Sequence, residues 1–261
     1  MNKNIRGHLF GLLSLGALRG HNLLPRYPFL RPLYRGYQKL YGILKPESVV
    51  VHGMVMYIGD DTVEHARLGE SYEKETTDAF KKYIRPGDTV IDVGANIGYF
   101  TLLAATLVGP KGRVFSFEPC REHFLLLEKN ITRNHLSNVK IFQQGVSDVK
   151  GRGEVVGDVV RPGDAIDLVP LDDVMTGSVN FVKIDIEGGE VRALRGMRRI
   201  LIENPDIILV AEFNEPALSS MGFEPHELLD TLREAGFSTE VLGRPEDQGV
   251  KNLLCMRAAR A

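Results

Sequence analysis

Short apolar runs alternate with longer amphipathic stretches over most of the 261-residue chain. Several runs are apolar at consecutive positions, as strands covered on both faces are. The predicted strands span residues 89–93, 113–117, 139–143, 180–184 and 206–212. The helical patterns between them span residues 97–108, 122–134, 190–203 and 226–235. Because strands and helices alternate, the sequence predicts an α/β fold with a doubly wound, mostly parallel sheet.

Weaker patterns flank these core elements. They predict a hairpin over residues 49–58, a helix over residues 72–83 and a C-terminal hairpin over residues 237–256. Residues 150–170 are rich in Gly and Asp and have little periodicity. We expect them to form a flap with one short strand at residues 153–156.

The N-terminal segment differs in charge from the rest of the chain. Residues 1–46 contain eight Lys or Arg and no Asp or Glu, whereas the remainder holds 24 basic and 34 acidic residues. Its apolar stretch at residues 9–18 is half as long as a membrane span. We predict a basic helical arm over residues 1–48 and one globular domain over residues 49–261. The arm would pack on the domain or on a second subunit of a homo-oligomer, lie on an anionic membrane surface, or serve in targeting.

Composition also bears on location and partners. The two cysteines, Cys120 and Cys255, have no metal-ligand spacing, which fits a reducing compartment. We therefore expect a cytoplasmic protein, with peripheral membrane attachment through residues 1–46 as the alternative. Nucleic acid is not an expected partner, because the domain is acidic and has no basic stripe interleaved with aromatic residues.

The most informative segment runs from residue 88 to residue 101, where a strand, a glycine turn and a helix start follow one another. Gly94 and Gly98 permit a sharp turn and a close approach to a ligand, and the helix start predicts free backbone N–H groups. Glu118 ends the next strand, where a carboxylate suits the two hydroxyls of a ribose. The glycine spacing matches neither the dinucleotide fingerprint nor a Walker loop.

Two longer motifs point to one family. Residues 92–99 read Asp-Val-Gly-Ala-Asn-Ile-Gly-Tyr, and residues 183–190 read Lys-Ile-Asp-Ile-Glu-Gly-Gly-Glu. Over roughly residues 68–240, the chain resembles the FkbM family of S-adenosylmethionine-dependent methyltransferases. The family pattern continues in residues 69–76, 117–119 and 130–138. The resemblance implies a Rossmann-like class I methyltransferase fold with one antiparallel strand near the C-terminal end, and S-adenosylmethionine as the cofactor.

The resemblance also assigns cofactor-binding residues. The methionine half of the cofactor would lie against the glycine loop, at Gly94, Ala95, Asn96 and Gly98. Asp92 would hold the cofactor ammonium directly or through water, unless it only ties down the turn. Glu118 would bind the ribose, with Pro119 beside the adenine.

Two further segments are implied as cofactor contacts, each with an open alternative. Val146, Ser147 and Asp148 would contact the amino edge of the adenine, or they form an ordinary Ser-Asp turn. Glu73 and Thr76 match the family's Tyr-Glu-x-x-Thr pattern and would close over the methionine end, although a solvated helix face explains them as well.

The motif at residues 183–190 supplies the candidate catalytic groups. Lys183 and Asp185 share one face of a strand, because side chains alternate with period two. A hydroxyl acceptor needs a base, and we expect Asp185 or Glu187 to take its proton while Lys183 orients or polarises. The alternative is a Lys–Asp pair that only stabilises the turn. Glu190 is expected to open the next helix.

The neighbouring strand end carries candidate groups for acceptor or metal binding. Glu212 and Asn214 end this strand and are the candidate substrate-binding residues. No metal site is predicted, because methyl transfer needs none. Mg²⁺ held by Glu212 and the two candidate bases is the alternative. No histidine stands at a spacing that predicts a transition metal, and His123 and His226 are interpreted as surface residues.

Together these residues predict an S-adenosylmethionine-dependent methyltransferase. The resemblance implies direct, in-line transfer to a hydroxyl of a small-molecule, sugar (glycan) or lipid-linked acceptor. The alternatives are an N-methyltransferase on a small molecule and a non-catalytic module that binds S-adenosylmethionine.

Overall fold

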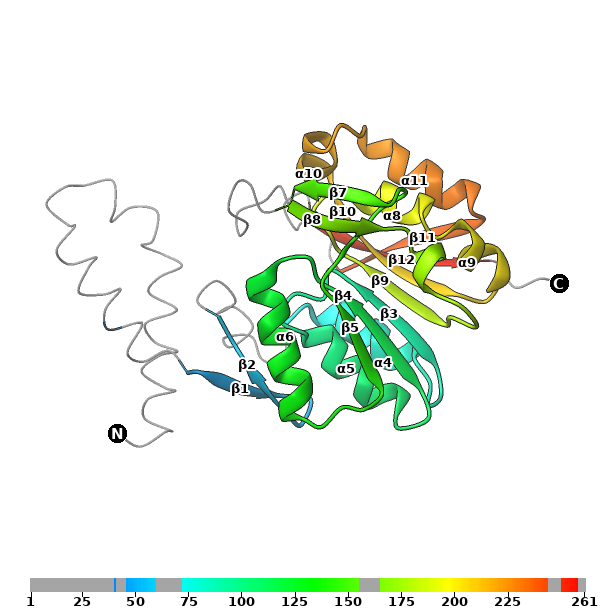
Figure 1. The fold of residues 1–261 in the computed structure, drawn as a ribbon. Coiled ribbons are helices and arrows are strands. Elements are labelled where there is room, and N and C mark those ends of the chain that lie inside the picture. Colours follow the sequence, from blue (N-terminus) through cyan, green and yellow to red (C-terminus); the bar gives the residue numbers. More distant parts are fainter. Residues whose placement is uncertain (1–39, 41–45, 60–71, 155–164, 244–249, 258–261) are drawn as a thin grey trace, which may run out of the picture.

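The computed structural model describes residues 40, 46–59, 72–154, 165–243 and 250–257, and a seven-stranded sheet lies at its centre (Figure 1). In spatial order the strands are β11 (Phe237–Leu242), β12 (Val250–Arg257), β10 (Ile208–Asn214), β9 (Phe181–Ile184), β3 (Thr89–Val93), β4 (Arg113–Phe117) and β5 (Val139–Phe142). Neighbours run parallel except where β12 pairs with β10 and β11. The predicted α/β fold with an antiparallel C-terminal strand is confirmed.

The sheet is covered on both faces, which explains why its strands are apolar at consecutive positions. In β3, Ile91 and Val93 belong to one buried cluster and Val90 belongs to the other. The first cluster includes side chains of α8 (Glu190–Arg195), α9 (Arg198–Glu203) and α11 (Pro225–Glu234). The second includes side chains of α4 (Lys74–Tyr83), α5 (Tyr99–Val108), β1 (Ser48–Val51) and β2 (Met54–Tyr57). Asp92 and Lys183 are register partners on this second face.

The predicted N-terminal hairpin forms from β1 and β2 and is anchored by α6 (Arg121–Arg133) and the residue after it. The Asn130 amide accepts from the Tyr57 N–H at 2.6 Å and donates to the Tyr57 carbonyl at 3.1 Å. Asn134 makes the same pair of bonds with the backbone of Val55. The two amides therefore pair backbone N–H and C=O groups on the edge of β2, as a neighbouring strand would. This gives residues 130–138 of the family pattern a structural role.

The helical pattern predicted over residues 190–203 is two helices, α8 and α9, rather than one. At the break, a side chain on Gly196 would collide with the backbone carbonyl of Ser147. The chain bends where this close approach requires a glycine. Two short helices, α7 (Leu171–Val174) and α10 (Glu215–Ser220), were not predicted, because a helix of one or two turns is too short to show a periodic pattern of apolar residues.

The flap predicted at residues 150–170 belongs to a second, three-stranded sheet. Its strands are β6 (Gly145–Val146), β8 (Ala165–Val169) and β7 (Gly151–Glu154), in that spatial order. The single strand expected at residues 153–156 is therefore shifted toward the N-terminus, and β8 was missed. Residues 155–164 lie outside the described part of the chain.

The predicted N-terminal arm, residues 1–48, lies outside the described residues except for positions 40 and 46–48. Its three alternative roles stay predictions, as does the boundary of the domain at residue 49. The described helices include none that is long and apolar enough to cross a membrane.

Candidate active site

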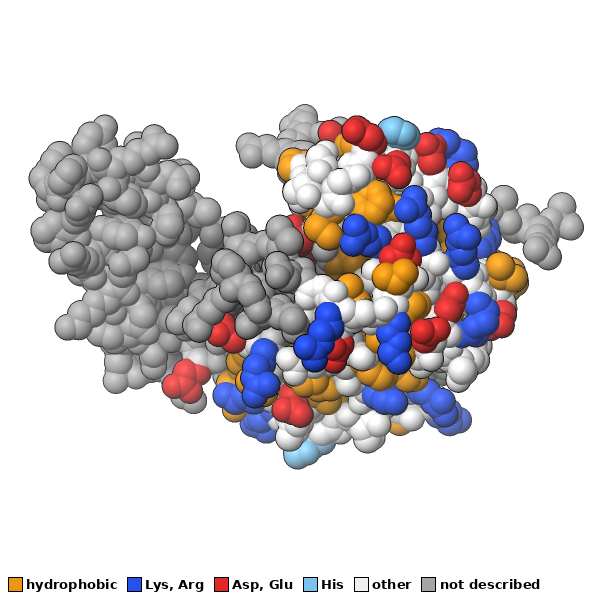
Figure 2. All heavy atoms as spheres, turned by 45° about the horizontal axis from the view of Figure 1, so that its top comes forward, with side chains coloured by type: hydrophobic (Ala, Val, Ile, Leu, Met, Phe, Trp, Pro, Cys, Tyr) orange, Lys and Arg blue, Asp and Glu red, His pale blue; other side chains and the backbone are white. Residues whose placement is uncertain are grey.

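A large cavity opens at the carboxyl ends of the central strands, where open α/β sheets bind their ligands. Its volume is about 1080 Å³, at the upper end of the usual range for small-molecule sites. The lining residues include the ends of β3, β4, β9 and β10, parts of β6, β7, β8 and α10, and the starts of α5, α6 and α8. On the face in Figure 2, acidic and basic side chains of the described residues are interspersed rather than gathered into a basic stripe.

The glycine loop after β3 packs tightly against the end of β9. Gly94 has φ 80°, and a side chain there would collide with the carbonyl oxygen of Asp185. At three positions of this loop, the backbone N–H groups are paired and are not among the free N–H groups predicted for this segment. Gly94 and Ala95 both donate to the Phe117 carbonyl at 3.0 Å, and Gly98 donates to Ala95. The loop can therefore hold a ligand by close approach and shape, but not by unpaired N–H groups at these three positions.

Asp92 lies behind this loop and does not line the cavity. It is fully buried, and its Oδ2 accepts from the Thr101 hydroxyl at 2.6 Å, which in turn lies 2.8 Å from the Ser116 hydroxyl. Its other oxygen, Oδ1, has no hydrogen-bond partner. Burial raises the pKa of Asp92, and the nearby Lys183 charge opposes that effect. These bonds tie β3, α5 and β4 together, whereas the two roles expected for Asp92, holding the cofactor ammonium or tying down the glycine turn, stay predictions.

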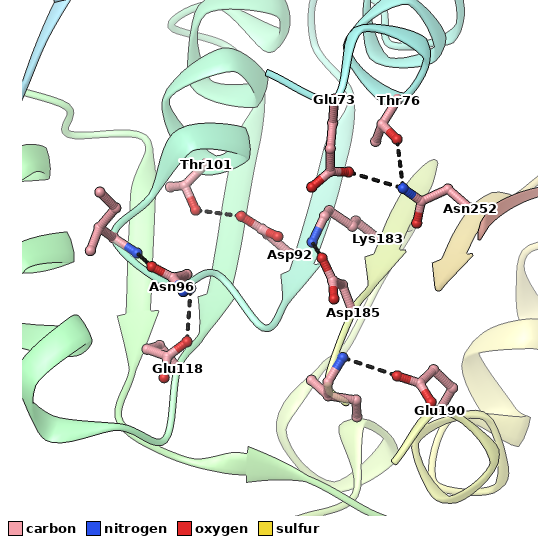
Figure 3. A network of polar contacts seen from close by, with 12 residues as sticks. Glu73, Thr76, Asp92, Asn96, Thr101, Glu118, Lys183, Asp185, Glu190 and Asn252 are labelled. Carbon is pink, nitrogen blue, oxygen red and sulfur yellow. Dashed lines mark hydrogen bonds and ion pairs between the residues drawn. The ribbon is translucent and has the colours of Figure 1, made fainter. Parts of the chain in front are cut away.

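Glu118 directly follows β4 and lines the cavity at the predicted strand end, and its carboxylate points toward Asn96 (Figure 3). Its Oε2 accepts from the Asn96 N–H at 2.7 Å, and its Oε1 accepts from the Cys120 N–H at 2.8 Å. Burial raises the pKa of Glu118, while these hydrogen bonds and the adjacent His123 favour the ionised form. Each carboxylate oxygen has two acceptor sites, so both retain capacity for a ligand hydroxyl.

The interpretation of His123 as a surface residue is wrong. Its side chain is 5% exposed, lines the cavity, and places Nδ1 3.9 Å from Glu118 Oε1. The helical pattern was correct, but α6 turns this residue toward the end of β4. His226 is exposed, as expected.

The predicted pair at the end of β9 is present. Lys183 Nζ lies 2.8 Å from Asp185 Oδ2, with the lysine side chain 3% exposed and the aspartate 25% exposed (Figure 3). Burial disfavours the charged lysine, but Asp185, Asp92 and Glu73 outweigh burial and raise its pKa. Lys183 is therefore a fixed cation rather than a proton acceptor. It also lies 5.1 Å from the Phe100 ring centre.

Glu73 approaches this pair from the start of α4 and lines the cavity. It has φ 38°, an unusual conformation for a residue other than glycine. The amide of Asn252, on β12, donates to Glu73 Oε2 at 2.9 Å and to the Thr76 hydroxyl at 3.0 Å (Figure 3). Thr76 itself is buried and does not line the cavity. Burial raises the pKa of Glu73, and Lys183 opposes the shift.

The loop after β9 is held in a constrained shape. Glu187 has φ 54°, and a side chain on Gly188 would collide with the backbone of Ala217. Glu190 opens α8 as predicted, but it is buried and its Oε1 accepts from the N–H groups of Ile186 and Gly188. Burial raises the pKa of Glu190 to about 7. Its buried carboxyl therefore ties down the loop that presents Asp185 and Glu187.

Glu212 and Asn214 both line the cavity from the end of β10. Glu212 is 9% exposed, and its Oε2 has no hydrogen-bond partner. Burial and the charges of Asp185, Glu187 and Glu190 raise the pKa of Glu212 to about 9. Its carboxyl is then protonated at neutral pH and can donate a hydrogen bond. Asn214 caps α10, since its Oδ1 accepts from the Ala217 N–H at 3.2 Å.

The opposite end of the cavity is more apolar. Phe117 stacks on Phe142 with ring centres 4.6 Å apart, and Phe117, Pro119, Val146 and Ser147 all line the cavity. Asp148 is exposed and outside the lining, although the Ser147 hydroxyl donates to it at 3.2 Å. Residues 148–150 form a bend, and the adenine contact expected for Asp148 stays a prediction.

Most of the predicted site residues meet in this one cavity. Those that line it are Glu73, Gly94, Ala95, Asn96, Glu118, Pro119, Val146, Ser147, Lys183, Asp185, Glu187, Glu212 and Asn214. Those that do not are Thr76, Asp92, Gly98 and Asp148. Lining residues that the sequence analysis missed include Tyr72, Tyr99, Phe100, Cys120, His123, Arg152, Arg192, Pro216, Ser220 and Met221. The position of residues 216–221 just after a core strand was a usable signal, because such loops border the site.

Comparisons with known sequences agree with this geometry. The chain matches the Methyltransferase FkbM domain over residues 92–239, more than half of its length. It is 39% identical over 97 residues to 31-O-demethyl-FK506 methyltransferase FkbM of Streptomyces tacrolimicus, covering 34% of this chain and 36% of that relative. It is 29% identical over 176 residues to hexuronic acid methyltransferase AglP of Haloferax volcanii, covering 61% and 68% of the two chains. The match thus spans about a third of one relative and two thirds of the other.

Solved structures show the same fold. The crystal structure of methyltransferase FkbM from Methylobacillus flagellatus aligns with a TM-score of 0.52 at 21% identity, over 76% of this chain and 55% of that one. A Streptococcus mutans protein solved in complex with SAH aligns with a TM-score of 0.50 at 10% identity, over 71% and 97% of the two chains. Fold, cavity and family match lead to one conclusion: the chain belongs to the FkbM family of S-adenosylmethionine-dependent methyltransferases.

Proposed function

We propose that this enzyme methylates a hydroxyl group on a small-molecule or sugar acceptor, free or lipid-linked. The observation that carries the proposal is the Lys183–Asp185 pair, which presents a carboxylate at the cavity wall between the ends of β3 and β10. A hydroxyl must lose its proton as it accepts a methyl group, so it needs such a base. The named relatives, one acting on 31-O-demethyl-FK506 and one on hexuronic acid, support an oxygen-rich acceptor.

The chemistry of the residues that line the cavity suits S-adenosylmethionine. Glu118 offers two oxygens with spare acceptor sites to the ribose, and Pro119 and Val146 offer an apolar wall to the adenine. The close-packed Gly94–Ala95–Asn96 turn and Glu73 would flank the methionine end. Asp92 would act from behind the turn, through its bond to Thr101 and its negative charge, rather than by direct contact.

Bound S-adenosylmethionine supplies an electrophilic methyl group on a positively charged sulfur. In the mechanism we propose, Asp185 accepts the hydroxyl proton at a carboxylate oxygen, and Lys183 holds that carboxylate in place. Glu187 is the alternative base on the same loop. The protonated Glu212 donates a hydrogen bond that orients the acceptor, assisted by Asn214 at the same strand end. Neither step requires a metal ion, so the Mg²⁺ alternative adds nothing to this mechanism.

The acidity of the catalytic end also suits an amine acceptor, which is the alternative function. The charged Asp185 and Glu187 would attract a protonated amine, and one of them would have to remove its proton before attack. The same base therefore serves both reactions, and the acceptor decides between them.

Calorimetric titration and turnover assays test the proposal in two stages. S-adenosylmethionine should bind wild type, and Glu118→Ala should weaken binding tenfold or more, about 1.4 kcal/mol. Asp185→Asn should keep cofactor affinity within threefold but reduce turnover about a hundredfold or more. Methyl glucopyranoside, methyl glucuronopyranoside and glucosamine serve as acceptors that distinguish hydroxyl from amine chemistry. The matched control is Asp206→Asn, an exposed aspartate at the opposite end of β10.

Full activity of Asp185→Asn together with full activity of Glu187→Gln would refute the assignment of the base. Absence of cofactor binding to wild type would refute the cofactor site itself. Faster turnover of glucosamine at nitrogen than of either glycoside at oxygen would favour the amine alternative.

A further inference from the structure

Three side chains with different metal-binding chemistry converge at the ribose-binding end of the cavity. A carboxylate oxygen of Glu118, the thiol sulfur of Cys120 and a ring nitrogen of His123 all lie within 4.8 Å of one another. All three residues are buried, with exposures of 5%, 9% and 5%, and all three line the cavity. In the described ranges 46–59, 72–154, 165–243 and 250–257, no other group of three such residues comes so close.

The start of α6 brings these side chains together. Cys120 is the N-cap residue of α6, and His123 is the third residue of the helix. Side chains at the N-cap and three residues later meet at the first turn, as they do in a capping box. Glu118 joins them because its Oε1 accepts the Cys120 N–H. The arrangement is therefore built into the local backbone and does not depend on a chance meeting of distant surfaces.

The geometry is close to that of a tetrahedral metal site. Zinc bonds of about 2.0–2.3 Å to oxygen, nitrogen and sulfur place the ligand atoms about 3.3–3.8 Å apart. His123 Nδ1 and Glu118 Oε1 are 3.9 Å apart, and no two of the three ligand atoms are more than 4.8 Å apart, so side-chain shifts of about 1 Å would close the site. Three protein ligands leave a fourth position toward the cavity for water. A thiolate and an imidazole favour Zn²⁺ over Mg²⁺.

We propose that Glu118, Cys120 and His123 form a binding site for a thiophilic divalent cation, foremost Zn²⁺, whose occupancy excludes S-adenosylmethionine. The exclusion rests on the proposed function, because the metal would take the carboxylate assigned there to the ribose. On binding, the sulfur–metal bond replaces the sulfur–hydrogen bond and the thiol proton passes to solvent. Zinc then acts as an inhibitor that competes with the cofactor. The proposal reverses the expectation that no histidine supports a transition metal.

Cobalt is the probe for the metal site itself, because a cysteine thiolate bound to Co²⁺ gives a near-ultraviolet charge-transfer band. Metal-free, full-length protein titrated with Co²⁺ should develop this band, and Cys120→Ser should not. The matched control is Cys255→Ser, which removes the other cysteine, buried in β12, and should keep the band. His123→Gln should weaken Co²⁺ and Zn²⁺ binding tenfold or more, whereas His226→Gln should not change it.

Competition tests the second half of the proposal. Saturating S-adenosylmethionine should raise the apparent dissociation constant of Zn²⁺ tenfold or more, and Zn²⁺ should likewise raise that of the cofactor in wild type but not in Cys120→Ser. Absence of the cobalt band in wild type, or its persistence in Cys120→Ser, would overturn the site. A band unchanged by cofactor that binds simultaneously would overturn the exclusion.

The metal site can be tested even if the proposed function is wrong. If metal-free wild type fails to bind S-adenosylmethionine, the cofactor site is refuted, but the cobalt band still decides the metal site. Circular dichroism and a second variant, Cys120→Ala, separate loss of the metal ligand from loss of folding. A folded Cys120→Ala protein that retains tight Zn²⁺ binding would count against the proposal.

Discussion

The two ends of the cavity differ in how their buried carboxyl groups are satisfied. At the end that we propose binds the ribose (the ribose-binding end), both oxygens of Glu118 accept backbone N–H groups. At the end that we propose is catalytic (the catalytic end), Glu212 has an oxygen with no hydrogen-bond partner, and burial together with the charges of three other carboxylates raises its pKa. The positive charge of Lys183 opposes that shift. At the ribose-binding end, each carboxylate oxygen thus has a hydrogen-bond partner before a ligand arrives. The catalytic end instead holds excess negative charge.

This difference assigns a different physical task to each end. Satisfied hydrogen bonds and stacked aromatic rings hold a fixed shape, which suits recognition of a rigid nucleoside. Uncompensated carboxyl groups cost stability in the free protein, and a positively charged ligand group relieves that cost. We therefore expect substitutions at the catalytic end to have larger effects that depend on pH.

The largest expected effect is that of Lys183→Met. This change removes the cation that Asp185, Asp92 and Glu73 share, and leaves buried carboxylates without compensation. Loss of one partner of a buried ion pair costs about 3–5 kcal/mol. Urea unfolding at pH 7 measures the loss, which should shrink toward pH 4 as the carboxylates become protonated.

The exposed Lys140 provides the matched control for this change. Lys140→Met removes a cation of the same size on β5, and we expect no comparable loss of stability. Equal destabilisation by the two substitutions would show that Lys183 does not act as a shared buried counterion.

The second-largest effect is expected from the buried carboxyl group of Glu212 at the catalytic end. The folded pKa of Glu212 is about 9 and its ordinary value is 4.5, so the folded state holds the extra proton between these values. Stability should therefore fall as pH rises through this window, by up to about 1.4 kcal/mol per pH unit. Between pH 7 and 9, above the pKa of Glu190, Glu212→Gln should flatten this fall and make the protein more stable than wild type at pH 9.

The corresponding change at the ribose-binding end should have the opposite sign. Glu118→Gln offers one oxygen to two backbone N–H groups, so it should cost about 1–3 kcal/mol at neutral pH. Urea unfolding across the pH range measures both variants, with the exposed Glu234→Gln as control. Destabilisation by Glu212→Gln at pH 9 would contradict the contrast between the two ends.

The smallest expected effect concerns the contact that closes the catalytic end. Asn252→Ala removes the amide that donates to Glu73 and Thr76, and should cost about 1–2 kcal/mol while weakening cofactor binding. Asn138→Ala is the control, because that amide also donates two hydrogen bonds, to Ala105 and Gly109, far from the cavity. A similar loss of cofactor affinity in both variants would show that Asn252 acts only through stability.

Local pattern was sufficient to predict most of the architecture. Strand–helix alternation predicted the parallel sheet, and period two placed Lys183 and Asp185 on one face, where they form their ion pair. The position of Glu118 directly after a strand predicted that it lies at the ligand-binding edge of the sheet. Elements without a full local period were missed, such as the short helix α10, and the break at Gly196 depends on contact with the distant Ser147.

The sequence by itself determined the fold class, the family and the strand ends at which polar groups gather, because periodicity and motif spacing are local properties of the chain. Only the tertiary structure decided which of those groups are satisfied. The backbone of Phe117 takes the N–H groups of the glycine loop, Asn252 reaches Glu73 from 179 positions away, and α6 buries His123 beside Glu118. These contacts follow from the packing of whole elements, and they set the burial and charge on which the chemistry depends.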